Sequence, residues 1–556
     1  MINLRRLSLQ TLSNPQTLCG EQSVLKAYLW ALTSGLLMAL AWESPGTGWS
    51  AVLGWASSLA LVGAVLHPRA SYKTLYSAGV VQTVLGFYWL FDTIRLFGGF
   101  PWYAAAAVFA LFVLVSACQN LVFLFVYRRL PPLLSRVGVG VAVAWVCSEW
   151  ISIRIFPWYF GHTQLGFPAL AQIADLAGVP LISLIMLWCS ECLVRAIFRM
   201  GLAQTSHPAS KSPAAHAALP PFPLSRLATA FGVTTLLLWY GTTRLERYAA
   251  PPGPKVKVAL VQANISIEEK HNMRFFGENK ARYIRLTKAL PPEAALVIWP
   301  ESVVQDFIPA DIGRAERDPR IPYFEGKHLL TGALTYKSKS EYFNSALQVL
   351  ADGTVPFPYH KQILMPFGEY MPGSTLFPWL NTLNPAGGQF SAGTEVTVMH
   401  FPALAPQPGH SEGGLPTIAA APLICYEDVV PSLAREAANK GAQLLINITN
   451  DAWFGDTIAP FQHHLIAAFR AIETRRYFLR STNSGLTAIV SPRGETIVTL
   501  PPFSEGTIWT EVTLLGDRTP FTAGVGDLPW WTLTALCLLS ILLTHRKCRV
   551  IRPRER

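Results

Sequence analysis

The stretch "PLICYED", residues 422–428, ends an apolar run with a cysteine, an aromatic residue and two acids in direct succession. An apolar run of strand length that stops at polar residues predicts a buried strand followed by a loop, and α/β folds commonly build their sites at such strand ends. Cys425 is also the only cysteine between residues 255 and 515. It has no disulfide partner within that region, so it is either an inert buried thiol or a reactive one.

The region around this stretch, residues 255–515, has the mixed pattern of an α/β domain. Apolar runs of strand length alternate with longer segments of helical periodicity. The predicted strands are 256–265, 295–302, 328–336, 342–350, 418–427, 442–451 and 486–492, and the predicted helices are 268–289 and 459–477. Continuous apolar strands indicate a sheet that helices cover on at least one face, so we expect a layered α/β fold.

The rest of the chain has the composition of a polytopic membrane protein. Hydrophobic residues make up 51% and charged residues 14% of the 556 residues, and the mean hydropathy is +0.30. A segment of roughly 20 apolar residues is long enough to cross a hydrocarbon core of about 30 Å. About eight segments meet this condition, at 24–42, 48–66, 74–96, 102–127, 137–154, 176–198, 226–243 and 529–544. We therefore expect a transmembrane bundle at 1–245, an α/β domain at 255–515, and a last span with a basic tail at 525–556.

Lysine and arginine in the short loops predict the orientation of these spans, because cytoplasmic loops carry the excess of both residues. Basic loops such as 67–73 and 127–136 alternate with poorer ones, and the chain ends in "HRKCRVIRPRER". Odd-numbered spans then run outward, and the α/β domain lies on the outer face. Much of the net charge of +11 belongs to the cytoplasmic segments, so we expect no nucleic-acid partner.

Three chemically distinct residues follow predicted strands in the α/β domain. Glu301 follows "VIWP", Lys361 follows "VPFPYH", and Cys425 follows "PLI". A thiol that loses its proton to a carboxylate can attack a carbonyl, and an ammonium can stabilise both the thiolate and the oxyanion that forms. Each residue alone is more typical of a solvated loop or of a core. Together they are a coherent set for acyl transfer.

The sequence motifs around these residues are more specific than the residues themselves. The segments "WPES", "YHKQILMPFGEYMPG" and "LICYED", in this order, resemble the Glu-Lys-Cys triad of the nitrilase superfamily. With seven spans before the domain and one after it, the whole chain resembles the apolipoprotein N-acyltransferase family. The resemblance implies a nitrilase-like sandwich with layers in the order α-β-β-α beside a polytopic helical bundle.

The resemblance also implies roles for individual residues. Cys425 would be the nucleophile, Glu301 the general base, and Lys361 the cation that stabilises the tetrahedral intermediate. Glu369 matches a second glutamate that the family needs beside the triad, and the pair after the nucleophile matches another required feature. That pair is Tyr426 and Glu427, which we expect to shape the thiol's pocket. For the two glutamates a purely structural role, holding loop backbone, stays open.

Other matching positions carry less weight. Asn450, Asp451 and Trp453 are expected to line the site, whereas three residues of the predicted helix 459–477 are expected to be structural. These three are His463, His464 and Arg470. The adjacent histidines lack the helical spacing and the partners of a metal site, so we expect no metal, and no cofactor is implied.

One position departs from the family pattern. The family often has Lys-Trp after the first strand, and this chain has Lys270 followed by His271. An aromatic side chain that could contact lipid is replaced by an imidazole, so lipid contact at His271 is in doubt.

The resemblance implies a ping-pong acyl transfer in the bacterial inner membrane, with the catalytic domain on the periplasmic face. A phospholipid would donate an acyl group to the cysteine as a thioester, and the α-amine of an apolipoprotein's diacylglyceryl-cysteine would accept it. Two alternatives stay open: a membrane-tethered nitrilase or amidase that hydrolyses small C–N substrates, and a non-catalytic lipid or lipoprotein receptor. The sequence assigns no role to Glu149, Glu191 or Asp428.

Overall fold

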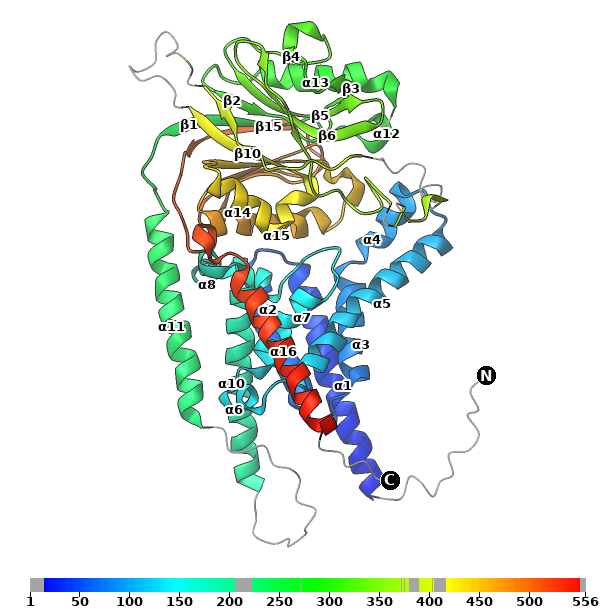
Figure 1. Cartoon of the computed structure of the whole chain (residues 1–556), viewed down its shortest axis with the longest axis vertical. Helices are drawn as coiled ribbons and strands as arrows, with labels where there is room; N and C mark the ends of the chain where they lie inside the picture. The colour runs from blue at the N-terminus through cyan, green and yellow to red at the C-terminus, as the bar shows by residue number, and fades with distance from the viewer. Residues whose placement is uncertain are drawn as a thin grey trace.

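The computed structural model describes residues 15–205, 223–270, 272–371, 373–374, 376–379, 390–402, 404 and 417–550. It has a helical region and an α/β region, which lies against one end of the helices (Figure 1). Helix α11 (Leu224–Arg247) leads from the helical region into the first strand, and α16 (Leu528–Val550) runs back alongside the helices after the last strand. The α/β region is therefore attached to the helical region at both of its ends.

Four helical segments within the described residues are long and apolar enough to cross a membrane. They are Ser23–Trp42, Gly48–Leu66, Trp102–Tyr127 and Val179–Ile197. These segments belong to α1 (Pro15–Trp42), α2 (Gly48–Leu66), α5 (Trp102–Tyr127) and α10 (Val179–Thr205). They coincide closely with four of the eight spans that the sequence predicts, and they support a membrane-embedded bundle.

The other four predicted spans have a different local structure. The predicted span 74–96 is interrupted after α3 (Tyr72–Gly86), and the chain continues as α4 (Trp89–Asp92) and a short π-helix (Thr93–Phe97). Helix α7 (Gly140–Ile151) and the apolar part of α16 are shorter than a full span, while α11 has 24 residues but is less apolar. Four shorter helices complete the region: α6 (Pro132–Val137), the 3-10 helix Phe160–Gly166, α8 (Pro168–Ala171) and α9 (Ala174–Ala177).

Two β-sheets form the centre of the α/β region. The first has the strand order β15-β1-β2-β5-β6-β8, with β3 paired to β5, and the second has the order β14-β13-β12-β11-β10-β9. The first sheet contains β1 (Lys255–Gln262), β2 (Leu296–Ile298), β3 (Val304–Pro309), β5 (His328–Ser338), β6 (Glu341–Val349), β8 (Tyr359–His360) and β15 (Gly506–Thr513). The second contains β9 (Met399–Phe401), β10 (Ile418–Ile424), β11 (Leu444–Thr449), β12 (Tyr477–Thr482), β13 (Thr487–Val490) and β14 (Thr496–Leu500). A separate pair is formed by β4 (Gly313–Arg314) and β7 (Thr354–Val355).

Alternation of side chains along the strands produces two separate hydrophobic clusters, one between the two sheets and one on the outer face of the first sheet. In β1, Val258 and Leu260 belong to a cluster shared with Ile424 and Ile446 of the other sheet, whereas Val261 packs on the opposite face. This follows from the period of two along a strand, which sends neighbouring side chains to opposite faces. Helix α13 (Phe276–Lys288) covers the outer face of the first sheet, and α14 (Pro431–Asn439) and α15 (Ala459–Thr474) cover that of the second. The layers therefore follow the predicted order α-β-β-α.

Helix α15 is shared between the sandwich and the membrane helices. Ala467 and Ala471 on one face pack against the second sheet, while Phe469 and Ile472 on the other face join the core of the helical bundle. Gln462 adds polar contacts, because its side-chain amide donates to the carbonyl of Gly86 at 3.0 Å. The layer that covers the second sheet is thus also the layer that docks it onto the membrane region (Figure 1).

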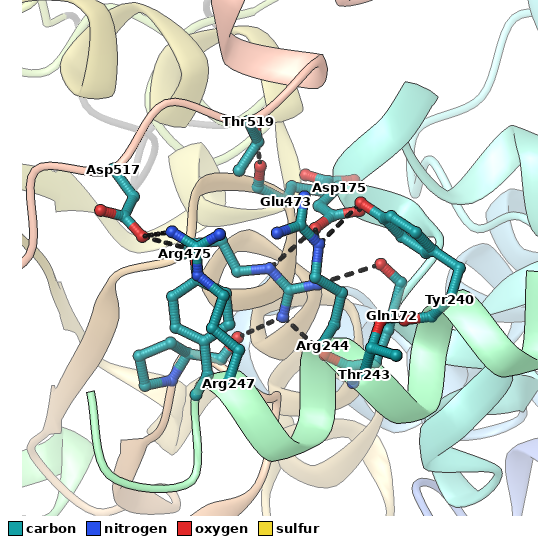
Figure 2. A network of polar contacts seen from close by, with 12 residues as sticks. Gln172, Asp175, Tyr240, Thr243, Arg244, Arg247, Glu473, Arg475, Asp517 and Thr519 are labelled. Atoms are coloured by element: carbon teal, nitrogen blue, oxygen red, sulfur yellow. Dashed lines mark hydrogen bonds and ion pairs between the residues drawn. The ribbon is translucent and has the colours of Figure 1, made fainter.

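A largely buried group of polar side chains adds to this docking (Figure 2). We call it the interdomain network, and it consists of Gln172, Asp175, Tyr240, Arg244 and Arg475. The guanidinium of Arg475 lies 2.7 Å from the Asp175 carboxylate, and both side chains are fully buried. Arg475 has φ 55° where α15 ends, so the left-handed turn that stops the helix also brings this side chain to the membrane region.

Each predicted strand and helix has a counterpart in the structure, whereas strands β3, β8, β9, β14 and β15 and helix α14 were not predicted. Two predicted elements also differ in their extent. The predicted helix 268–289 is divided into α12 (Ile267–Lys270), a 3-10 turn at Met273–Phe275, and α13. The predicted helix 459–477 ends at Thr474, and strand β12 begins at Tyr477, where the sequence pattern indicated no strand. Only two residues separate these elements, which is too short an interval for the change of period to be read from apolar spacing.

Candidate active site

Cys425 follows directly after strand β10, at the carboxyl end of that strand in the second sheet. The strand ends at Ile424, and Cys425 begins a short 3-10 helix with φ 52°, a left-handed conformation that is uncommon for a residue with a side chain. The backbone turns sharply at this point, and the half-buried thiol lies at the turn. Asn447 of the adjacent strand β11 holds the turn, because its side-chain amide donates to the carbonyls of Leu423 and Cys425, each at 3.1 Å.

The two other members of the predicted triad meet beside this turn. The Lys361 Nζ atom lies 3.6 Å from Glu301 Oε1 and 2.7 Å from Glu369 Oε2. Asn344 joins the two carboxylates, since its side-chain amide donates to Glu301 at 2.7 Å and to Glu369 at 2.8 Å. We call these four residues the catalytic cluster. Glu301 lies in the loop after β2, Asn344 lies within β6, Lys361 is the residue after β8, and Glu369 lies in the loop that follows Lys361.

Electrostatics couple the catalytic cluster to the thiol. Burial raises the pKa of the Cys425 thiol and Glu301 raises it further, whereas Lys361 and the Thr449 hydroxyl lower it; the pKa stays above its ordinary value. Burial alone would lower the pKa of Lys361, but Glu369, Cys425 and Glu301 together raise it. At neutral pH the cluster therefore holds a charged ammonium beside a protonated thiol, which has to lose its proton to react.

Close backbone packing fixes the position of Glu301. A Cβ on Gly332 of β5 would lie 2.5 Å from the Glu301 Cα and 2.3 Å from the backbone nitrogen of Ser302, so only glycine fits there. The buried Lys270 donates from Nζ to the Glu301 carbonyl at 2.9 Å. Burial lowers the pKa of Lys270 to about 8, although Glu301 and Cys425 oppose this shift. A second lysine thus lies next to the nucleophile and the expected base.

Glu427 has a supporting role in the structure. Its fully buried carboxylate accepts hydrogen bonds from the backbone nitrogens of Ile424 at 2.7 Å and Gln362 at 2.6 Å, and from the Tyr359 hydroxyl at 2.8 Å. Burial raises its pKa to about 7. The carboxylate thereby ties the end of β10 to the loop that carries Lys361. Its contacts are those of a residue that holds loop backbone.

Tyr426 contacts the membrane region. Its hydroxyl donates to the carbonyl of Ile155, in the segment that follows α7, and its ring packs against the core of the helical bundle. The residue next to Cys425 is therefore a point of attachment between the sandwich and the bundle.

Asp428, to which the sequence assigned no role, belongs to a group of ionisable side chains that is hydrogen-bonded to the residue holding the turn at Cys425. We call this group the buried quartet, and its members are Asp428, Asp451, His463 and Arg480. Arg480 forks between the two carboxylates, with Nη1 2.5 Å from Asp428 and Nη2 2.7 Å from Asp451. Arg480 also donates to the Asn447 side chain at 2.8 Å, so the quartet is linked to the residue that holds the turn at Cys425.

The remaining predicted residues have various environments. Asn450 is buried and accepts a hydrogen bond from Asn483 at 3.1 Å, and Trp453 is half-buried in the 3-10 turn Asp451–Phe454. His464 contacts the Thr496 hydroxyl at 2.9 Å, and Arg470 pairs with Glu473 at 3.0 Å. His271 lies outside the described residues.

The two acids of the membrane helices are paired within the bundle. Glu149 accepts from the indole nitrogen of Trp145 at 2.8 Å, and Glu191 pairs with Arg195 at 2.8 Å. Both contacts lie within the helical region, and the Oε2 atom of Glu149 is buried without a hydrogen-bond partner among the described residues.

Three polar residues near the thiol escaped the sequence analysis: Asn344, Asn447 and Arg480. Each is a buried side chain in the middle of an otherwise apolar strand, in "YFNSAL", "LLINIT" and "YFLRST". Because an unpaired polar group is costly to bury, a single polar residue within an apolar strand indicates a specific partner. That signal could have found all three.

The α-β-β-α sandwich and its cysteine, lysine and glutamate define a nitrilase-like domain, and comparisons with known proteins agree. The family model "Carbon-nitrogen hydrolase" matches residues 257–516, and "Apolipoprotein N-acyltransferase N-terminal domain" matches residues 34–192. An apolipoprotein N-acyltransferase of Geobacter metallireducens is 30% identical over 94% of this chain and 95% of its own length. One of Pseudomonas syringae pv. tomato is also 30% identical, over 92% and 95%. The chain belongs to the apolipoprotein N-acyltransferase family.

Among solved structures, the Saccharomyces cerevisiae protein Nit3, described as a member of branch 10 of the nitrilase superfamily, is similar to part of the chain. The match is 19% identical, covers 47% of this chain and 90% of the yeast protein, and has a TM-score of 0.35.

Proposed function

We propose that this chain is a membrane acyltransferase that matures lipoproteins, moving a fatty acyl group from a phospholipid to an apolipoprotein through a thioester on Cys425. The observation that carries the proposal is the position of the catalytic cluster. The Lys361 ammonium lies between two carboxylates and is electrostatically coupled to Cys425, in a domain that packs directly on membrane helices. Lipid-anchored substrates need a nucleophile that is held at the bilayer, and the packing of this domain on the apolar helices supports such a position for Cys425.

In the first step the Cys425 sulfur attacks an ester carbonyl of the phospholipid. Because the thiol is protonated at rest, Glu301 accepts its proton as the new C–S bond forms. The carbonyl oxygen becomes an oxyanion, and the Lys361 ammonium stabilises this charge. The intermediate then collapses, the ester C–O bond breaks, and Glu301 returns the proton to the oxygen of the departing lysophospholipid.

In the second step the α-amine of the apolipoprotein's diacylglyceryl-cysteine attacks the thioester. Glu301 accepts a proton from the amine, the C–S bond breaks, and the proton passes to the Cys425 sulfur. An amide forms, and the enzyme returns to its starting state. Glu369 and Asn344 keep Lys361 and Glu301 in place throughout both steps, because they hydrogen-bond to these side chains.

The proposal includes the division of the chain into a bundle at 1–245, a catalytic domain at 255–515 and a final span at 525–556. It also includes eight spans, a location in the bacterial inner membrane, and a catalytic domain on the periplasmic side. The alternation of basic and poorly charged loops supports this orientation. Exposed apolar side chains of the segment 374–390 support lipid entry near the site, since Leu376 is 79% and Trp379 is 60% exposed. Much of that segment lies outside the described residues.

Labelling of introduced cysteines tests the orientation. Ser340→Cys, in the exposed turn between β5 and β6, should react with a membrane-impermeant maleimide in intact spheroplasts. Arg69→Cys, in the loop 67–73, should react only after the membrane is opened. The opposite pattern would reverse the proposed orientation.

Mass spectrometry of the full-length protein tests the chemistry. After incubation with a phospholipid that carries an isotopically labelled acyl chain, the peptide containing Cys425 should carry the label as a thioester. Addition of a synthetic diacylglyceryl-cysteine peptide should then move the label to the peptide amine.

Cys425→Ser should not form the thioester, whereas Cys118→Ser, which replaces an exposed cysteine of α5, should behave as the wild type. Acylation of another cysteine would contradict the assignment of Cys425. Turnover of small amides without any acyl thioester would instead indicate a hydrolase.

A further inference from the structure

The buried quartet is hydrogen-bonded to Asn447, the residue that holds the turn at Cys425. Arg480 donates to the Asn447 side-chain oxygen at 2.8 Å, and the Asn447 amide donates to the Cys425 carbonyl at 3.1 Å. Leu423, Asn447 and Arg480 are neighbours across three parallel strands. A movement of the arginine would therefore be transmitted to the peptide bond that follows the thiol.

We propose that Asp428, Asp451, His463 and Arg480 form a positioning device for Cys425, and that His463 carries a proton when the enzyme is active. The inference rests on the proposed function and extends it to the residues beneath the nucleophile. These residues position the nucleophile through Asn447, and the lipid substrates do not contact them.

Charge balance is the first argument for a protonated His463. Asp428 and Asp451 bring two negative charges, and Arg480 brings one positive charge into a site where all three side chains are fully buried. With a neutral imidazole the quartet has one uncompensated negative charge, which is costly inside a protein. With an imidazolium the quartet is neutral.

The contacts of the imidazole are the second argument. Nε2 lies 2.7 Å from Asp428 and Nδ1 lies 3.2 Å from Asp451, so an imidazolium can donate to a carboxylate from each nitrogen. Nδ1 is also 2.9 Å from the Arg480 Nη2, a contact that would favour a neutral ring accepting from the guanidinium. The ring thus has two arrangements, and its proton decides between them.

The charged and titratable groups around the ring determine which arrangement prevails. Asp428 faces it from the 3-10 helix after β10, Asp451 from the turn after β11, Arg480 from β12, and His464 is its neighbour on α15. Burial and Arg480 lower the pKa of His463, but the two aspartates outweigh them and raise it above 6.5. Burial lowers the pKa of His464 to about 3, so this second ring stays neutral.

The proton on His463 has a direct consequence for the thiol. Arg480 is electrostatically coupled to Cys425, and loss of the His463 proton would leave the quartet negative beneath a group that has to become a thiolate. Negative charge near a thiol disfavours its ionisation. The device therefore both holds the turn and keeps the charge below it from opposing the reaction.

Two substitutions at position 463 separate charge from packing. His463→Gln keeps a hydrogen-bonding side chain without charge, whereas His463→Lys keeps a permanent positive charge between the aspartates. The side chain is 11% exposed, so both changes can be accommodated. His464→Gln is the matched control, because it removes the adjacent imidazole, which contacts Thr496 instead of the quartet.

Alkylation of Cys425 by iodoacetamide, followed by mass spectrometry of its peptide, measures the effect without any lipid. At pH 7.5 we expect the His463→Gln protein to react about tenfold more slowly than the wild type, the effect of one unit in the thiol pKa. His463→Lys and His464→Gln should react within about twofold of the wild type. This readout stands even if the lipid chemistry proposed above is wrong.

Acyl transfer by the full-length protein gives the second readout. We expect His463→Gln to lower kcat about tenfold with little change in KM for the phospholipid, because the lipid does not contact the quartet. Wild-type kcat should fall on the alkaline side as His463 loses its proton, and His463→Lys should not show that fall.

Two results would overturn the proposal. One is a His463→Gln protein with the alkylation rate and pH profile of the wild type. The other is a loss of kcat in both 463 variants that parallels an equal loss of thermal stability, since that would show a purely structural role.

Discussion

The interdomain network and the buried quartet both combine buried acids with arginines, but only the quartet contains a histidine. The interdomain network combines Asp175 with two arginines and a tyrosine, and it joins segments 300 residues apart. It contains no histidine, the type of side chain whose ordinary pKa lies near neutral pH. The quartet contains His463, and although burial lowers the pKa of this ring, Asp428 and Asp451 raise it above the ordinary value of 6.5. Buried charge thus serves as a fixed connection in one place and as an adjustable support in the other.

The largest expected effect comes from breaking the fixed connection. Asp175→Asn would leave the buried Arg475 without its carboxylate partner, and removal of one member of a buried ion pair typically costs about 3–5 kcal/mol of stability. Thermal or denaturant unfolding in detergent would measure this loss. Asp527→Asn, which removes the partly exposed partner of Arg435, should cost about 1 kcal/mol or less. Equal effects of the two changes would mean that the interdomain network adds nothing by being buried.

The next largest effect concerns the catalytic cluster, where the proposed mechanism gives the Lys361 ammonium a direct part in the reaction. Lys361→Met should lower kcat by about 10²–10³, the usual effect of removing one group that stabilises an oxyanion. Steady-state acyl transfer measures kcat, and circular dichroism checks that the variant is folded. Lys440→Met, at a half-exposed lysine paired with Glu436, should retain wild-type activity. A Lys361→Met protein that kept full activity would exclude the role proposed for the ammonium.

A smaller effect is expected on the stability of the buried quartet at acidic pH. Burial raises the pKa of Asp451, but Arg480 and His463 outweigh this and hold it below its ordinary value of 3.8. Its contribution to stability is therefore present above about pH 4 and is lost as the pH falls through the lowered pKa. Stability measured between pH 7 and pH 3 should decline less steeply in Asp451→Asn than in the wild type. Parallel curves would show that Asp451 does not gain stability from these partners.

The smallest effect is expected at the direct contact between the nucleophile's neighbour and the bundle. Tyr426→Phe removes one hydrogen bond, to the Ile155 carbonyl, and keeps the ring in the bundle core. A single neutral hydrogen bond contributes about 1 kcal/mol, so unfolding should shift slightly and kcat should change by less than about tenfold. A loss as large as that of Lys361→Met would instead place the hydroxyl in the reaction.

The sequence predicted the layers of the sandwich and three members of the catalytic cluster, Glu301, Lys361 and Glu369, because these depend on local signals. Apolar runs of strand length lead into Glu301 and Cys425, and the sequence motif around Lys361 is specific for the family. The strand that carries Arg480 was missed because it follows α15 after only two residues, with no turn residue to separate them. The role of Asp428 could not be predicted, because its partners come from β12 and α15 and meet it only in the folded protein.

Leu423 pairs with Asn447, and Asn447 pairs with Arg480, so one residue from each of β10, β11 and β12 lies in a row across the sheet. Since side chains alternate between the faces of a sheet, loss of one residue from β11 would turn Asn447 away from both neighbours while leaving every catalytic residue in the chain. The reactivity of the thiol should therefore depend on the length of β11 as well as on its residues. In this part of the protein, point substitutions should be tolerated far more readily than insertions or deletions.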